Sequence, residues 1–223
     1  KPKHRKVPQM ALSKAIFATA PTFGQTDVVG RFRAGAQEGG RPIALSAWRI
    51  TTGDPELAAR VAKEFGGKPA PWDTATEEGI EVYTDQDSVQ VIVEDIFAEM
   101  TLWGRNKPIR SCDGIVQNDD NQTPCACPAD FAERKAKSRE GSACQPNIRV
   151  RFRLAAMPDA GLWKFQSSSW QLAQEIPDLM AHLKAAKSGE GTLSLKLIEW
   201  NTKTGESRKF TKPVLELHAS TAT

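Results

Sequence analysis

The sequence contains 223 residues, of which 39% are hydrophobic and 26% are charged, and this ordinary composition excludes a wholly disordered chain and a membrane protein. A chain of this length buries enough surface to form a hydrophobic core. The net charge of +3 comes from 30 basic and 27 acidic residues, and the isoelectric point of about 8.7 lies below the value of roughly 9 that marks dedicated DNA-binding domains.

The first 20 residues are expected to form a basic tail followed by a short amphipathic segment. The basic residues of the tail are Lys1, Lys3, Arg5 and Lys6. Leu12, Ile16 and Ala20 are spaced to share one face of a helix. A secretory signal peptide also has a basic start and an apolar stretch, but Ser13 and Lys14 interrupt the stretch here. We therefore expect a soluble, intracellular protein.

Two strands and a helix are predicted next. The strands cover residues 27–34 and 43–51, joined as a hairpin through the turn-rich segment 37–42. The helix follows Asp54, which can cap it, and begins at Pro55, a residue suited to a first turn. A pair of glycines ends this helix. Its apolar stripe consists of Leu57, Val61 and Phe65.

Four short strands and a polar insertion follow. Residues rich in β-branched and aromatic types predict strands at 79–84, 88–93, 98–103 and 108–112. The next segment, 113–146, contains three cysteines and many polar residues but little apolar pattern. We expect it to fold around something other than a hydrophobic core.

Regular patterns return after the insertion. Strands are predicted at residues 147–156 and 162–166, and a final hairpin at 191–200 and 207–217. A helix is predicted from residue 170 to about residue 187. Ser168 and Gln171 have capping-box spacing at its start, and Pro177 should kink or split it.

Strict alternation of strands and helices is missing from this order, which favours an α+β fold over a parallel α/β fold. We predict a mainly antiparallel sheet with two or three helices and a zinc-stapled loop insertion. The expected organisation is a single α+β domain over residues 21–217, with the insertion at about 112–146 and a C-terminal tail at 218–223.

All four cysteines fall within 33 residues. They are Cys112, Cys125, Cys127 and Cys144. Four thiolates are a standard ligand set for structural zinc, although a C-x-C pair is less common than C-x2-C. Two disulfides would need an oxidising compartment, and unpaired buried cysteines are the third alternative. Zinc is favoured because metal ligation contributes on the order of 10 kcal/mol where this insertion has few apolar residues to bury.

The usual motifs of nucleophilic, metal-dependent or phosphate-binding catalysis are missing from the sequence. Of the three histidines, His182 lies on the predicted helix, where a structural role is favoured over a catalytic one. We therefore expect a protein that is not an enzyme, with a hydrolase left as an alternative.

Two groups of basic residues are candidates for contact with a partner or with phosphates. One follows the cysteine pair and the other alternates along the strand after the insertion. The candidates are Arg134, Lys135, Lys137, Arg139, Arg149, Arg151 and Arg153. The alternative is that these residues form a solvent-exposed face, where their charges prevent an edge strand from pairing with another chain.

A series of landmarks runs in order through nearly the whole chain. They are Gly30-Arg31-Phe32-Arg33, then Phe65-Gly66-Gly67-Lys68-Pro69-Ala70-Pro71-Trp72, then Trp103-Gly104-Arg105-Asn106-Lys107-Pro108-Ile109-Arg110-Ser111-Cys112-Asp113-Gly114, then Cys125-Ala126-Cys127-Pro128, and last Gly161-Leu162-Trp163-Lys164-Phe165-Gln166-Ser167. With these landmarks the sequence resembles the recombination directionality factors that Streptomyces phages encode alongside a large serine integrase.

The resemblance implies a protein that binds the integrase, promotes recombination between the attL and attR sites, and inhibits recombination between attP and attB. The partner surface would lie near the coiled coil of the integrase, DNA would be reached indirectly, and the site of action would be the cytoplasm of the bacterial host. A zinc-containing DNA-binding regulator is the main alternative function.

Overall fold

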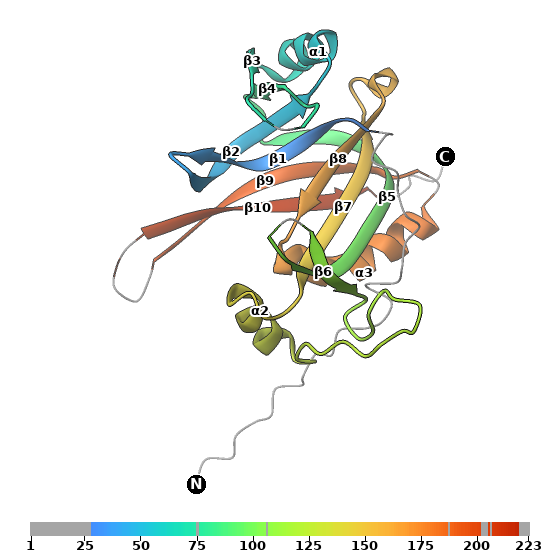
Figure 1. Ribbon diagram of the computed structural model, residues 1–223. Helices are drawn as coiled ribbons and strands as arrows, with labels where there is room; N and C mark the ends of the chain where they lie inside the picture. Colours follow the sequence, from blue (N-terminus) through green and yellow to red (C-terminus); the bar gives the residue numbers. More distant parts are fainter. Residues whose placement is uncertain are drawn as a thin grey trace. The chain divides into compact units, whose positions relative to one another are not determined.

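The computed structural model describes residues 28–74, 76–105, 107–186, 188–201, 205 and 207–218 (Figure 1). The predicted basic tail, the amphipathic segment and most of the C-terminal tail lie outside these residues, so the domain boundaries stay predictions. Within the described ranges, no helix has the length and apolar character needed to cross a membrane.

The described residues form a sheet of ten strands with three helices. The strands are β1 (Val28–Glu38), β2 (Arg41–Thr52), β3 (Pro69–Pro71), β4 (Ile80–Tyr83), β5 (Ser88–Trp103), β6 (Pro108–Cys112), β7 (Gln145–Leu154), β8 (Leu162–Ser167), β9 (Glu190–Asn201) and β10 (Ser207–Leu217). The helices are α1 (Pro55–Phe65), α2 (Phe131–Arg139) and α3 (Trp170–Ala185), and a 3-10 turn covers Pro158–Ala160.

Hydrogen bonding orders the strands as β10-β9-β5-β7-β8-β1-β2-β4-β3, with β6 also paired to β5. The pairs β1–β2, β2–β4, β3–β4, β5–β6, β5–β9 and β9–β10 are antiparallel, and β1–β8 is parallel. The predicted α+β class with a mainly antiparallel sheet is therefore confirmed.

The chain divides into two compact units. The small unit contains residues 97–148 and the large unit contains residues 28–96 and 149–218. Strands β5 and β7 each contribute residues to both units. The four cysteines all belong to the small unit, whereas the long hairpins and α3 belong to the large unit.

The first hairpin turns more tightly than predicted. Glu38 pairs with Arg41, so only Gly39 and Gly40 form the turn, and both have positive φ values of 55° and 76°. Two consecutive positive φ values are typical of the two-residue turns that match strand twist, and glycine adopts them without strain. As predicted, Asp54 caps α1, and its Oδ1 accepts hydrogen bonds from the N–H groups of Glu56 and Leu57.

Three predictions about two elements need correction. Strand β5 is one 16-residue strand rather than two. Helix α3 is capped by Ser169, whose Oγ accepts the N–H of Leu172, rather than by Ser168. The helix also continues through Pro177, although proline cannot donate to the carbonyl four residues before it. Of the two predicted effects of Pro177, a kink or a split, the split is therefore wrong.

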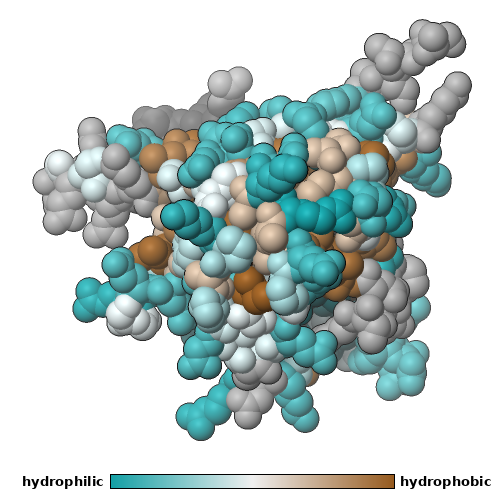
Figure 2. Space-filling view, turned by 90° about the horizontal axis from the view of Figure 1, so that it is seen from above, coloured by the Kyte–Doolittle hydropathy of each residue, from teal (hydrophilic) through white to brown (hydrophobic). Residues whose placement is uncertain are grey.

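The core of the large unit is built from aromatic side chains on one face of the sheet. Phe32 lies at its centre, and its ring centroid is 5.6 Å from Trp48, 5.2 Å from Phe152 and 5.6 Å from Trp163, each in an edge-on arrangement. Trp48 also packs edge-on against Phe165. Such pairs each contribute about 0.5–1.5 kcal/mol beyond the burial of their surface. Hydrophilic side chains cover most of the face seen in Figure 2, and hydrophobic ones form small separate patches there.

The small unit lacks an equivalent core. Between residues 113 and 142, all of which the structure describes, Cys127 is the only buried hydrophobic side chain. The loops in this stretch are held by backbone turns, by buried polar contacts and by the cysteines, as expected from the polar sequence.

Candidate metal centre

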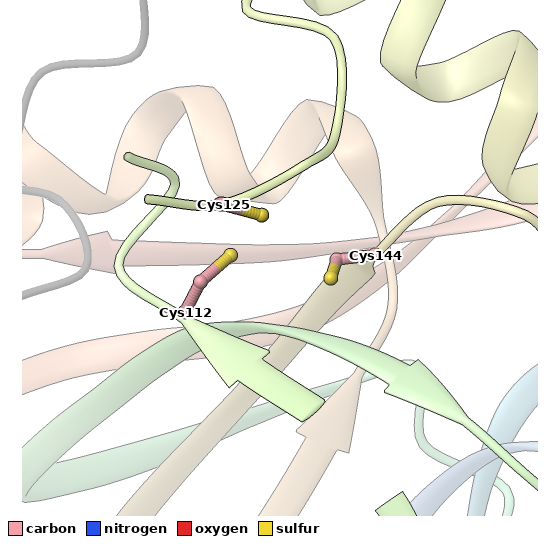
Figure 3. A group of neighbouring side chains, drawn as sticks. All are labelled: Cys112, Cys125 and Cys144. Atoms are coloured by element: carbon pink, nitrogen blue, oxygen red, sulfur yellow. The ribbon is translucent and has the colours of Figure 1, made fainter. Parts of the chain in front are cut away.

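Three cysteines from separate segments point their sulfur atoms toward one another (Figure 3). Cys112 ends β6, Cys125 lies in the following loop, and Cys144 immediately precedes β7. Their Sγ atoms all lie within 4.8 Å of one another. A tetrahedral zinc ion with Zn–S bonds of about 2.3 Å brings sulfur atoms to about 3.8 Å from each other. Small movements of the side chains would therefore bring these three sulfur atoms to the spacing of a zinc site.

The fourth cysteine lies beside this group. Cys127 is buried, and its Sγ accepts the backbone N–H of Cys144 at 3.2 Å and the Nη2 of Arg110 at 3.3 Å. It also hydrogen-bonds to Cys125. Hydrogen bonds from outer groups to the ligands are a common feature of metal sites, because they orient the ligands and tune the metal. The structure thus brings all four predicted cysteines together, with Cys127 outside the group of three that share the 4.8 Å limit.

The loop that carries Cys125 is built by a turn after Cys112. The Oδ1 atom of Asp113 accepts the N–H groups of Ile115 and Val116, each at 2.8 Å. The N–H of Cys125 then donates to the carbonyl of Ile115 at 2.7 Å. Gly114 has a φ of 100°, which glycine tolerates better than other residues. This turn returns the chain so that Cys125 faces Cys112.

Arg134 fixes two of these segments from helix α2. Its Nε donates to the carbonyl of Pro128 and its Nη2 to the carbonyl of Gly114, both at 2.7 Å. Only 1% of Arg134 is exposed. A guanidinium group buried in this way stabilises the loops and is not accessible to a partner, so the expectation that Arg134 forms part of a contact surface does not fit its position.

Hydrogen bonds among the thiols shift their pKa values in opposite directions. Hydrogen bonds from Cys112 and Cys144 lower the pKa of Cys125. The same interaction with Cys125 raises the pKa of Cys112 to about 11, and hydrogen bonding to Cys112 raises the pKa of Cys144. A divalent cation that binds here would displace the remaining thiol protons, since cysteine binds metal as the thiolate.

Arg110 supplies positive charge at the edge of this group. Hydrogen bonding to Cys144 and Cys127 raises the pKa of Arg110. Sequence reasoning did not include Arg110 among the site residues. Its position two residues before Cys112 on a strand is the signal that could have found it, because residues i and i+2 of a strand lie on the same face.

The other predicted basic residues lie on α2 and β7. On α2, Lys137 and Arg139 are exposed and Lys135 is half-buried. On β7, Arg151 forms an ion pair with Asp95 at 2.6 Å and Arg153 with Glu94 at 2.9 Å. Arg149 occupies the equivalent alternating position on the same strand. The metal centre in the small unit therefore does not include the β7 arginines, which belong to the large unit.

A match over most of the chain identifies its family. The model of a Gp3-like family, described as recombination directionality factor-like, matches residues 29–218. The chain belongs to this recombination directionality factor-like family. No solved structure matches the chain. The resemblance found in the sequence landmarks is thereby confirmed, and the family gives this directionality factor-like protein a general role in recombination together with a recombinase.

Proposed function

We propose that this protein binds a phage serine integrase, activates recombination between attL and attR, and inhibits recombination between attP and attB. The observation that supports this most is the family match over residues 29–218. The integrase supplies the nucleophilic serine, so the protein acts as a non-enzymatic regulator in the cytoplasm of the bacterial host. It contacts the integrase near the coiled coil and reaches DNA through the integrase.

The physical requirement for this role is unequal binding to two arrangements of the integrase. A shift of a two-state balance from 1:99 to 99:1 needs about 5.5 kcal/mol of differential affinity. A protein surface of fixed shape can provide this difference if it fits one arrangement of the partner and clashes with the other.

We propose that Cys112, Cys125, Cys127 and Cys144 bind one structural Zn²⁺ ion that fixes the loops of the small unit. The support is the grouping of three sulfur atoms within 4.8 Å and the hydrogen bonds that place Cys127 beside them. Four protein ligands leave no open coordination position for water, so such an ion would hold structure and would not take part in catalysis.

The small unit also exposes large hydrophobic side chains. A cluster of such exposed side chains on a monomeric protein often marks a binding surface. These side chains are Trp103, Ile109 and Ile115. Ile115 lies between two of the proposed ligands and is 46% exposed, although its backbone N–H and carbonyl are both fixed in the loop. We propose that these side chains, with Lys135, Lys137 and Arg139 of α2, contact the integrase. A contact through Arg149, Arg151 and Arg153 of β7, which belong to the large unit, stays a separate proposal.

Purified integrase tests the proposal when it is incubated with attL and attR substrates, and separately with attP and attB, with and without this protein. We expect the protein to increase attL × attR product and to decrease attP × attB product. Product yields that do not change on its addition would refute the proposed function. Activity of the protein on DNA without integrase would instead support a DNA-binding regulator or an enzyme.

The same assay with I115D locates the contact. We expect this variant to need a concentration about tenfold higher for half-maximal activation, since a buried aliphatic contact contributes about 1.5–3 kcal/mol. L197D is the matched control, because Leu197 is also 46% exposed but lies on β9 in the large unit. Equal activation by I115D and by the unchanged protein would exclude Ile115 from the contact.

A further inference from the structure

Four basic side chains lie close to one another on the face of the large unit's sheet that lies opposite the aromatic core, and one carboxylate lies among them. They come from three neighbouring strands of the sheet, β7, β8 and β1. In the parallel pair β1–β8, Arg31 lies directly beside Lys164. The four residues, which we call the cationic cluster, are Arg31, Arg33, Arg149 and Lys164.

Glu78 is the carboxylate of this cluster, and its oxygen atoms are already engaged. It forms ion pairs with the Nε of Arg31 and, at 2.8 Å, with the Nη2 of Arg33. It also accepts a hydrogen bond from the Oγ1 of Thr51 at 2.7 Å. Lys164, by contrast, forms no ion pair with any residue that the structure describes. Arg31, Arg33 and Lys164 therefore carry more positive charge than Glu78 alone balances.

This excess charge is costly where it lies. Burial lowers the pKa of Lys164, and the positive charges of Arg31, Arg149 and Arg33 lower it further, although the negative charge of Glu78 acts in the opposite direction. Burial also lowers the pKa of Arg33 despite its ion pair with Glu78. A group of like charges removed from water is stabilised by an anion from outside the group.

Two hollows border the cluster and meet at Arg33. One, of about 490 Å³, is lined by Arg31, Arg33, Ser167 and Phe210 among others. The other, of about 540 Å³, is lined by Arg33, Arg49, Trp72, Tyr83 and Ile43 among others.

The rims of these hollows include exposed apolar and aromatic side chains. Phe210, Tyr83 and Ile43 are exposed large hydrophobic residues. Trp72 lies under two guanidinium groups, with its ring centroid 4.8 Å from the Cζ of Arg33 and 4.4 Å from that of Arg49. The surface thus combines recessed positive charge with apolar contacts around it.

We propose that the cationic cluster docks an acidic segment of the recombinase, with a carboxylate side chain placed at Lys164 and Arg31 and its apolar neighbours on the exposed rim. This inference rests on the proposed function, because it takes the recombinase as the partner. It adds a second contact surface, in the large unit, to the one proposed near the metal centre.

A protein partner fits this surface better than the backbone of DNA. Phosphate contacts usually come from exposed basic side chains on a surface with strong positive charge, whereas Arg31, Arg33 and Lys164 are half-buried. Glu78 and Glu81 pair with some of the arginines, so the positive charge that remains suits a single carboxylate better than a row of phosphates. With the four basic residues of the N-terminal tail set aside, the basic and acidic residues of the chain nearly balance.

The test compares the unchanged protein with K164E in binding to immobilised integrase. We expect K164E to bind at least about tenfold more weakly, which corresponds to about 1.4 kcal/mol, and to lose part of the salt dependence of binding. Its thermal midpoint should stay equal or rise, since a carboxylate beside Arg31 and Arg149 removes repulsion. K164Q should show a smaller loss of affinity in the same direction.

The control is K63E, which makes the same change of charge at an exposed position of α1 and should bind like the unchanged protein. If K164E binds integrase as well as K63E does, the docking inference fails while the proposed function stands. If no form of the protein binds integrase, both fail. If K164E loses affinity only for attL and attR duplexes measured without integrase, the surface binds DNA and the inference is wrong.

Discussion

Two arginines of the small unit, Arg110 and Arg134, have different tasks although both lie close to cysteines in the sequence. Arg134 donates to two backbone carbonyls and is buried. Arg110 donates to the sulfur of Cys127 and approaches Cys144. A zinc ion bound by four thiolates carries a net charge of about −2, and Arg110 lies where it would offset part of that charge.

We predict that R110M binds zinc about tenfold more weakly, because loss of an outer-shell partner costs about 10–100-fold in metal affinity. The measurement is a competition titration against a chromophoric chelator. R105M is the matched control, since Arg105 is an exposed arginine of the same unit. Equal zinc affinity of R110M and R105M would show that Arg110 has no part in the site.

The sequence predicts which residue type would bind the metal, but not which residues surround the ligands. Four cysteines in a polar insertion indicate a metal from composition alone. The burial of Arg134 could not be predicted, because α2 is polar on all sides and its one buried residue is this arginine. What buries Arg134 is the position of the carbonyls of Gly114 and Pro128, which depends on the folded loops.

At the scale of the element, β5 shows why a strand can be longer than its sequence pattern. Glu94 and Asp95 interrupt the apolar alternation, so the sequence predicts two strands. The structure pairs them with Arg153 and Arg151 of β7. Partners about 56–59 residues apart leave no local signal, and cross-strand pairs of opposite charge stabilise a sheet by about 0.2–1 kcal/mol.

The ion pairs Asp95–Arg151 and Glu94–Arg153 allow a comparison of a more buried pair with a more exposed one. We predict that D95N lowers the free energy of unfolding by about 1–2 kcal/mol, because it weakens a hydrogen bond to a charged group in a pair whose side chains are 17% and 25% exposed. E94Q should change it by less than about 0.5 kcal/mol, since Arg153 and Glu94 are 38% and 44% exposed. Urea denaturation of both variants measures the difference. Equal losses of unfolding free energy in D95N and E94Q would contradict the expectation that the more buried ion pair contributes more stability.

The other helices and strands also separate into those that local sequence signals predict and those that they do not. Helix α1 was predicted with its cap and stripe because Asp54, Pro55 and the apolar spacing are local. Strand β3 and helix α2 were missed, since β3 is a three-residue segment that pairs only with β4 and α2 has no apolar stripe. Elements that depend on distant partners therefore lie beyond what local patterns can predict.

At the scale of the whole molecule, the two units depend on different sources of stability. The large unit buries aromatic rings from β1, β2, β7 and β8. The small unit buries little apolar surface between residues 113 and 142. A bound structural zinc ion would contribute on the order of 10 kcal/mol there, which would make the small unit the part that depends on metal.

We therefore predict that removal of zinc by a strong chelator has a local effect. Amide hydrogen exchange should become faster in residues 113–144 and stay slow in β1, β2 and β8, where the aromatic core is. C112S should show the same pattern without chelator. Uniform acceleration across the chain, or none anywhere, would argue against a metal confined to the loops.

The parallel pairing of β1 with β8 also matters during synthesis. Their paired residues lie more than 130 positions apart, so at a synthesis rate of about 5–20 residues per second β1 emerges from the ribosome on the order of ten seconds before β8 exists. During that interval the β1–β2 hairpin has an open edge that could pair with another nascent chain. Arg31 and Arg33 place charges on this strand, and charged side chains discourage such pairing, so residues of the proposed docking surface would also keep growing chains apart.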